Sequence, residues 1–210
     1  MITTKVKGKA IPARMGRPLS FDRDIALERA MLVFWDLGYD GASVAELTCA
    51  MGITAPSLYT AFGDKQRLFL EATQRYLTRP DANLRILLDQ SATAFSAVEA
   101  MFAAASVQQT RHGKPHGCMV MSASINSPSA TEVQTAIRTL RTEVEDWIKT
   151  RIDRGVVQGE LSNTVDTAAL AAYYMSVLEG ISTQARDGAS REKLRAISGL
   201  ALSVWPGKPR

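Results

Sequence analysis

Hydrophobic residues recur along this chain at spacings of three and four, which is the period of an amphipathic α-helix. Apolar and polar residues never alternate over a sustained run, and no Asn-Gly or Asp-Gly turn lies between β-branched runs. The pattern therefore predicts an all-α protein.

The first two predicted helices have clear start and stop signals. Asp22 is a suitable N-cap for a helix that stops at Gly38, a residue type that commonly terminates helices. Ser43 and Glu46 have the S-x-x-E spacing of a capping box, which predicts a second, short helix from there to Gly52.

A third short helix follows almost at once. Thr54 is its predicted N-cap, and Pro56 falls in its first turn, where a missing N–H has no helical partner to lose. Asp64 caps a fourth helix, which Pro80 should end or kink. Two short helices with so brief a turn between them have the spacing of a helix-turn-helix, at about residues 43–62.

Beyond residue 80 the composition shifts to long alanine-rich amphipathic stretches, which predicts a second and larger helical region. The predicted helices cover residues 94–109, 118–125 as a short helix behind the loop RHGKPHG, 128–156, 164–186 and 190–205. We therefore expect three parts: a flexible arm at 1–19, a helix-turn-helix domain at 20–80 and a larger helical domain at 81–210.

The overall composition is that of a chain that folds by itself in a reducing compartment. Its 210 residues are 46% hydrophobic, which is enough for a packed core. No run of 18 apolar residues occurs, and the first residues lack the apolar segment of a signal peptide. The two cysteines, Cys49 and Cys118, are far apart and form no C-x-x-C. We expect a soluble cytoplasmic protein without a membrane segment.

Positive charge is concentrated at the start of the chain. Residues 1–17 contain five of the 25 basic residues and no acidic residue, so the remainder holds 20 basic against 21 acidic groups. A basic arm on a nearly neutral body is typical of polyanion binding, and a solubilising tail is the alternative.

The third predicted helix has a polar outer face that carries almost no charge. Leu58 and Phe62 are four residues apart and should face the core. The residues expected to face outward are Thr54, Ala55, Pro56, Ser57, Tyr59 and Thr60. Small hydroxyl and methyl groups suit contacts with base edges, and the Tyr59 hydroxyl and the Lys65 ammonium can hold phosphates.

Four motifs in this region resemble those of the TetR family of bacterial repressors. They are A-x-x-x-F-W-x-x-G-Y at 30–39, S-V-x-x-L at 43–47, G-I-x-x-x-S-L-Y at 52–59 and F-x-x-K-x-x-L-F at 62–69. The resemblance implies that the DNA-facing residues are Ser43, Thr54, Ala55, Ser57, Tyr59, Thr60 and Lys65. Ala55 and Ala61 stand where many relatives have larger polar residues, so the operator sequence cannot be deduced from this helix.

Several of these positions also have simpler interpretations. Tyr59 alone would be a surface aromatic, and Lys65 alone an ordinary exposed lysine. Arg17 lies in M-G-R-P, which is similar to the core of arms that enter A/T-rich minor grooves, and a plain linker is the alternative.

In the larger domain the resemblance extends only to the helix pattern and a G-E-L turn at 159–161. It implies a ligand cavity. We also expect a homodimer formed through the last two predicted helices, because each of them has an apolar face. The candidate cavity residues are Phe95, Met101, Phe102, Cys118, Met121 and Tyr174. For any one of them, ordinary core packing is the default interpretation.

The residues His112, His116 and Cys118 are of metal-binding types, but no fourth ligand is evident, and we predict neither a metal nor a cofactor. Lys114 and a nearby helix N-terminus could activate Cys118 as a sensor of electrophiles, and buried packing is the alternative.

The prediction from sequence is a homodimeric DNA-binding transcription regulator, a repressor that a small-molecule inducer releases from a double-stranded DNA operator. The alternatives are an activator of the same fold, a helical enzyme or a protein-binding adaptor. No G-x-S-x-G, H-E-x-x-H or phosphate-binding glycine loop supports an enzyme.

Overall fold

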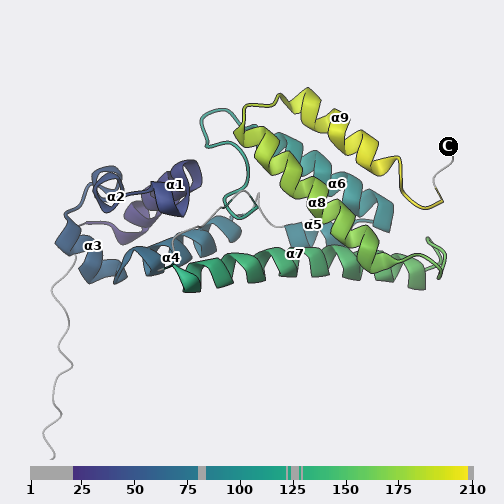
Figure 1. The fold of residues 1–210 in the computed structure, drawn as a ribbon, viewed down its shortest axis with the longest axis horizontal. Helices are drawn as coiled ribbons and strands as arrows, with labels where there is room; N and C mark the ends of the chain where they lie inside the picture. Colours follow the sequence, from purple (N-terminus) through teal and green to yellow (C-terminus); the bar gives the residue numbers. More distant parts are fainter. Residues whose placement is uncertain (1–20, 80–83, 122, 124–127, 129, 208–210) are drawn as a thin grey trace, which may run out of the picture.

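The computed structural model describes residues 21–79, 84–121, 123, 128 and 130–207. Within these residues it contains nine α-helices and no strand (Figure 1), which confirms the all-α prediction. The helices are α1 (Arg23–Gly41), α2 (Val44–Met51), α3 (Ala55–Phe62), α4 (Lys65–Leu77), α5 (Leu84–Gln90), α6 (Ala94–Gln108), α7 (Thr131–Val157), α8 (Thr167–Arg186) and α9 (Arg191–Leu202).

The caps predicted for the first four helices are present. The Asp22 carboxylate accepts two N–H groups of α1, at 2.9 and 3.0 Å. Ser43 and Glu46 form the reciprocal capping box of α2. The side chains of Thr54 and Asp64 cap α3 and α4. Each cap satisfies an N–H that the helix itself leaves unpaired, so the local sequence alone fixes where these helices begin.

Helix α1 is interrupted at the residue where its end was predicted. Gly38 has φ 73° and ψ 176°, a backbone conformation outside the helical region that a glycine adopts without steric cost. Helical geometry resumes only for the few residues that follow, up to Gly41.

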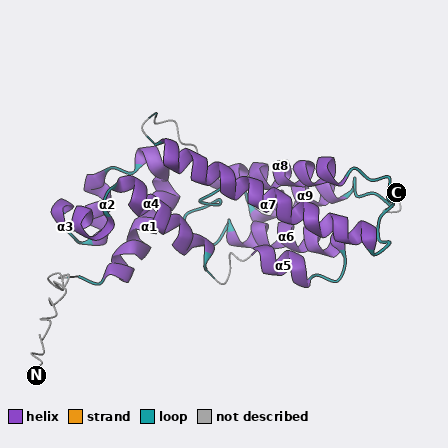
Figure 2. Ribbon diagram, turned by 90° about the horizontal axis from the view of Figure 1, so that it is seen from below, coloured by secondary structure: helices purple, strands orange, loops and turns teal. Residues whose placement is uncertain are grey.

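The helices form two groups joined by α4 (Figures 1 and 2). Helices α1, α2 and α3 gather at one end, and α4 packs on α1 and leads toward the second group. There α7 runs beneath α5, α6 and α8, while α9 packs on α6 and α8. No helix among the described residues is long and apolar enough to cross a membrane.

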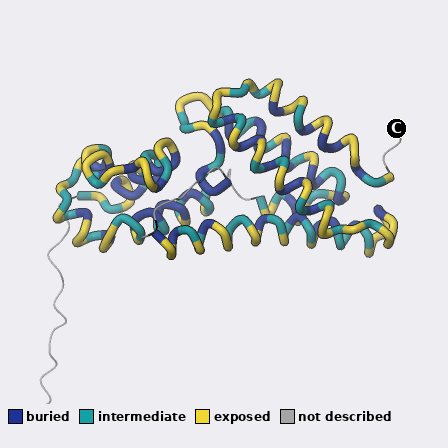
Figure 3. Tube along the Cα trace, in the orientation of Figure 1, coloured by how far each residue is buried: buried dark blue, intermediate teal, exposed yellow. Residues whose placement is uncertain are grey.

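Buried residues lie on the inner faces of both groups of helices (Figure 3). In the first group the rings of Phe34 and Phe69 join α1 to α4 edge to face, with centroids 5.0 Å apart. In the second group Phe102 and Tyr174 join α6 to α8 at 5.8 Å. Each of these four residues is at most 1% exposed, so both ring contacts lie inside the core.

The G-E-L turn anchors the far end of the second group. Glu160 accepts the N–H of Ala94 at 2.5 Å and lies 3.5 Å from the guanidinium of Arg151, whose side chain is 1% exposed. Burial, with the charge of Arg154 as a smaller cause, lowers the pKa of Arg151. One carboxylate therefore caps α6 and compensates a buried charge.

Some predicted helix boundaries differ from the structure. Helix α5 was not predicted. The predicted short helix over residues 118–125 is wrong where the structure describes it, because residues 118–121 and 123 form turns and a loop. Helix α7 begins at Thr131 rather than at 128, because the chain is still turning at Pro128. Helix α8 begins at Thr167 rather than at 164, after its cap Asp166, and α9 ends at Leu202 rather than at 205.

Candidate DNA-binding site

The turn between α2 and α3 has the geometry of a helix-turn-helix. Gly52 ends α2 in the left-handed region, with φ 70° and ψ 34°. The N–H of Ile53 bonds back to the carbonyl of Thr48 at 3.1 Å, and Thr54 then caps α3. The angle between the two helices is therefore fixed by backbone hydrogen bonds and by a glycine conformation that other residues rarely adopt.

Helix α3 is held against the other helices of the first group by its buried apolar face and by an arginine of α1. Leu58 and Phe62 are 0% and 3% exposed. The guanidinium of Arg23 lies 4.3 Å from the ring centroid of Phe62, donates to the carbonyl of Ala61 at 3.2 Å and pairs with Glu71 of α4 at 2.7 Å. Arg23 thus joins α1, α3 and α4, and its role in positioning α3 was not predicted from the sequence.

The outer face of α3 carries hydroxyl groups whose orientation is set by internal hydrogen bonds. The Thr60 hydroxyl donates to the carbonyl of Pro56 at 2.8 Å, so the lone pairs of the Thr60 oxygen can accept a hydrogen bond from outside the protein. The hydroxyls of Thr54 and Ser57 are 2.9 Å apart, so one donates to the other and one O–H is left to donate outward. Tyr59 is 49% exposed. Ala55 lies on the same helix, half-buried in its first turn.

Ser43 occupies the exposed start of α2. Its oxygen accepts the N–H of Glu46 at 3.1 Å, and the Glu46 carboxylate accepts the N–H of Ser43 at 2.8 Å. The hydrogen bonds between Ser43 and Glu46 lower the pKa of the Glu46 carboxyl.

Lys65 is held in place by an aromatic ring. Its ammonium lies 4.4 Å from the ring centroid of Tyr39 on α1. Partial burial lowers the pKa of Lys65, while the nearby charges of Asp40 and Glu46 raise it. The ring contact limits the motion of a long side chain at the start of α4, next to α3. Of the predicted DNA-facing residues, Arg17 lies outside the described residues.

A cavity of about 450 Å³ lies in the second group of helices. The side chains that line it come from α4 to α8 and from the segment around Cys118; they include Gln74, Tyr76, Leu77, Met101, Cys118, Met121, Leu140, Glu143, Trp147 and Leu178. A volume of this size suits a small organic molecule.

Only half of the six candidate cavity residues lie at this cavity. Met101, Cys118 and Met121 line it. Phe95, Phe102 and Tyr174 do not. Instead they form a chain of ring contacts with Trp205, in which Phe95 is 5.6 Å and Tyr174 5.8 Å from the Trp205 ring centroid. The spacing of aromatic residues along a helix does not distinguish a cavity wall from a packed core.

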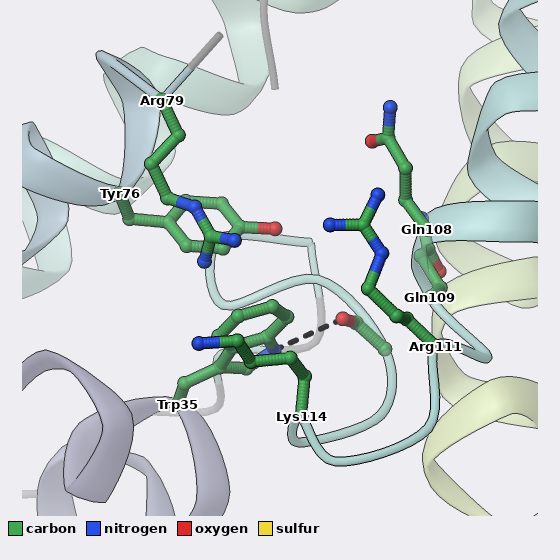
Figure 4. A pocket seen from close by; sticks show the side chains of 8 residues that line it. Trp35, Tyr76, Arg79, Gln108, Gln109, Arg111 and Lys114 are labelled. Carbon is green, nitrogen blue, oxygen red and sulfur yellow. Dashed lines mark hydrogen bonds between the residues drawn. The ribbon is translucent and has the colours of Figure 1, made fainter. Parts of the chain in front are cut away.

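Gly117 and Cys118 connect this cavity to the first group of helices. The indole N–H of Trp35 on α1 donates to the carbonyl of Gly117 at 3.0 Å (Figure 4). Next to it, the Tyr76 hydroxyl lies 3.4 Å from the Cys118 sulfur, and the Cys118 N–H donates to Ser182 of α8 at 2.7 Å. Burial, with the adjacent Cys118 as a smaller cause, raises the pKa of Tyr76 well above its usual range.

His112 and His116 are both exposed in the loop that precedes this segment. Across the described part of the chain, no group of three or more His, Cys, Asp or Glu side chains is placed to hold a metal ion.

The clamped α3 with its hydroxyl-bearing outer face, set beside a fixed lysine, defines a helix-turn-helix transcription regulator. Two family descriptions match the chain: "Bacterial regulatory proteins, tetR family" over residues 26–72 and "Tetracyclin repressor-like, C-terminal domain" over residues 94–198. The chain belongs to the TetR family. Membership of this family of regulators also removes the enzyme and adaptor alternatives.

Individual relatives agree with this assignment. The HTH-type transcriptional repressor ComR of Escherichia coli is 34% identical over 91% of this chain and 92% of its own. The HTH-type transcriptional repressor BdcR of the same organism is 30% identical over 89% of this chain and 90% of its own. A cysteine mutant of the TetR family regulator CifR, complexed with 26-bp double-strand operator DNA, is 41% identical, with a TM-score of 0.86 over 91% of this chain and all of that one.

Proposed function

We propose that this chain is a repressor that binds a double-stranded DNA operator as a homodimer and leaves it when a small molecule fills the cavity. The outer face of α3 is the observation that carries the DNA-binding part. Its hydroxyls and its exposed Tyr59 lie on a helix that Arg23 and the buried Leu58 and Phe62 hold in place.

Within this proposal each polar group has a role set by its geometry. Thr54, Ser57 and Thr60 meet base edges in the major groove, because their free donors and lone pairs point away from internal partners. Tyr59 and Lys65 hold phosphates on either side of the groove. The start of α2 and the N-terminal arm complete the proposed interface.

The first of these is the start of α2, where Ser43 and the adjacent helix N–H groups favour a phosphate. The second is the arm: Arg17 enters the minor groove, where a narrow A/T-rich sequence concentrates negative potential. Pro56 and Ala55 contribute methylene and methyl surface to the same face of α3.

An exposed apolar strip on α8 and α9 supports the dimer. Tyr173 on α8 is 39% exposed, Leu200 on α9 is 73% exposed, and Val204 just after α9 is 56% exposed. Large apolar side chains on the outer face of two adjacent helices suit a four-helix contact with the same pair in a second copy. The proposal assigns residues 20–80 to the DNA-binding domain and 81–210 to the domain for ligand binding and dimerisation.

Release by a ligand is supported by the position of α4. Gln74, Tyr76 and Leu77 near its end line the cavity, while Lys65 at its start lies beside α3. A ligand that displaces the end of this helix therefore changes the position of the DNA-contacting end as well.

An electrophoretic mobility shift with the DNA that flanks the chain's own gene tests the proposal. We expect a saturable shift that unlabelled flanking DNA abolishes and that an unrelated duplex of equal length does not. A Thr54→Val, Ser57→Ala double variant should lose this preference while it still binds both duplexes weakly. Equal binding of both duplexes by the unmodified protein would exclude a specific operator there. Expression of the adjacent gene should rise when this regulator is deleted; a fall would indicate an activator instead.

A further inference from the structure

The side chains that line the 450 Å³ cavity are biased toward one kind of charge. Among the described lining residues there is one carboxylate, Glu143, and no lysine or arginine. The other polar side chains are three glutamines, the Tyr76 hydroxyl and the Cys118 thiol, all of them electrically neutral groups. The cavity therefore presents a negative charge within a largely apolar wall.

Glu143 lies at an accessible edge of this wall. It is exposed, and it makes no hydrogen bond or ion pair with another described residue. Leu140, Val144 and Trp147 line the cavity from the same face of α7. A carboxylate placed one turn from an indole ring, on a shared helix face, offers a cation both an anionic partner and a π surface.

A second unpaired acceptor belongs to a residue that lines the cavity. Gln109 is 7% exposed, and its side-chain oxygen is buried without a hydrogen-bond partner among the described residues. Because this oxygen is buried, a ligand in the cavity does not reach it unless the Gln109 side chain rotates. Glu143 is therefore the acceptor that is open to a ligand.

Two arginines near this wall are already engaged and do not line the cavity. The guanidinium carbon of Arg85 lies 6.0 Å from the centroid of the Trp147 ring, and its side chain is within 3.9 Å of Asp89. Arg141 lies 3.7 Å from Glu179. The position of Arg85 shows that the Trp147 ring tolerates a cation nearby.

We infer that the ligand of this cavity is an amine, protonated at neutral pH, with an apolar body, and that Glu143 binds its ammonium group. The inference rests on the proposed function, because it names the ligand of the cavity to which we assign release from DNA. Carboxylates and phosphates are disfavoured, because no cation among the described lining residues would compensate them.

Three probes of matched shape test this inference: 4-phenylbutylamine, 4-phenylbutanol and 4-phenylbutanoate. Their affinities for the full chain are measured by calorimetry in the absence of DNA. We expect the amine to bind about tenfold more tightly than the alcohol, and the carboxylate to bind least. Glu143→Gln should weaken the amine about tenfold and change the alcohol less than about twofold. Glu145→Gln, which alters the net charge equally but lies outside the cavity wall, should change neither.

Several results would overturn the inference. They are a carboxylate or an alcohol that binds as well as the amine, an amine that does not bind, or equal effects of the two glutamine variants. Because Glu143 is exposed, its substitution should leave the thermal unfolding curve unchanged, and this check separates weaker binding from impaired folding. The operator shift without any probe tests the DNA-binding proposal separately, so either proposal can fail while the other stands.

Discussion

Replacement of Trp35 by phenylalanine should destabilise the protein more than the loss of ring area explains. Trp35 is 5% exposed, and its indole N–H donates to the carbonyl of Gly117, a residue 82 positions later. Phenylalanine keeps an aromatic ring against Tyr76, whose centroid lies 4.9 Å away, and keeps the backbone carbonyl that Arg186 contacts. The hydrogen bond is the specific loss.

Two contributions give the expected magnitude. A buried carbonyl left without its donor costs about 1–3 kcal/mol. The smaller ring buries roughly 40 Å² less apolar surface, which is about 1 kcal/mol at roughly 25 cal/mol per Å². Trp35→Phe should therefore lower the free energy of unfolding by about 2–4 kcal/mol.

Trp205→Phe is the matched control. Trp205 is 7% exposed and packs against Phe95 and Tyr174, but its indole N–H makes no hydrogen bond with the described residues. It should lose only the area contribution, about 1 kcal/mol. Denaturant unfolding followed by circular dichroism, at one fixed protein concentration, measures both variants. A Trp35→Phe loss no larger than that of the control would refute the importance of the Gly117 bond.

Four further substitutions test the other sites. Lys65→Ala should weaken binding to all duplexes and lower the salt slope of log K by about 0.9 for each phosphate that the variant no longer binds; an unchanged slope would place Lys65 outside the interface. Arg17→Ala should cost on the order of 1–3 kcal/mol on operators with A/T-rich flanks and less on G/C-rich ones, and equal losses would make the arm a general phosphate tether. Leu200→Arg should give monomers by light scattering, whereas Val157→Arg, at a similarly exposed apolar site on α7, should not; two unchanged dimers would exclude α9 from the interface. Glu160→Gln should cost about 3–5 kcal/mol, because it leaves a buried guanidinium without its charge partner, and a loss below about 1 kcal/mol would show that the pair is unimportant.

The first four helices could be predicted from the sequence because their signals are local. A cap such as Ser43 or Thr54 acts within three residues, and a glycine such as Gly52 determines its own backbone geometry. The predicted burial of Leu58 and Phe62 followed from helical period alone and is confirmed.

The contacts that position the sites join residues far apart in the chain, and no local pattern indicates them. Arg23 reaches Ala61 across 38 residues, and Trp35 reaches Gly117 across 82. The short helix predicted near Cys118 failed for a related reason. In that segment the Cys118 N–H donates to Ser182, and the carbonyls of Val120, Met121 and Ala123 accept from Arg141 of α7, so tertiary contacts override its helical pattern.

Helix α4 is joined to α1 near both of its own ends, and this limits how a ligand can act on DNA binding. At one end Lys65 of α4 lies over Tyr39 of α1, and at the other Tyr76 of α4 packs against Trp35 of α1. Bending α4 would break one of these contacts and open a packed core, whereas moving both helices together leaves their shared core intact. Since Arg23 also joins α3 to this pair, the pair should carry α3 with it as a rigid body. A ligand that displaces the cavity end of α4 should therefore move α3 relative to the second α3 of the proposed dimer and leave the internal structure of α3 unchanged.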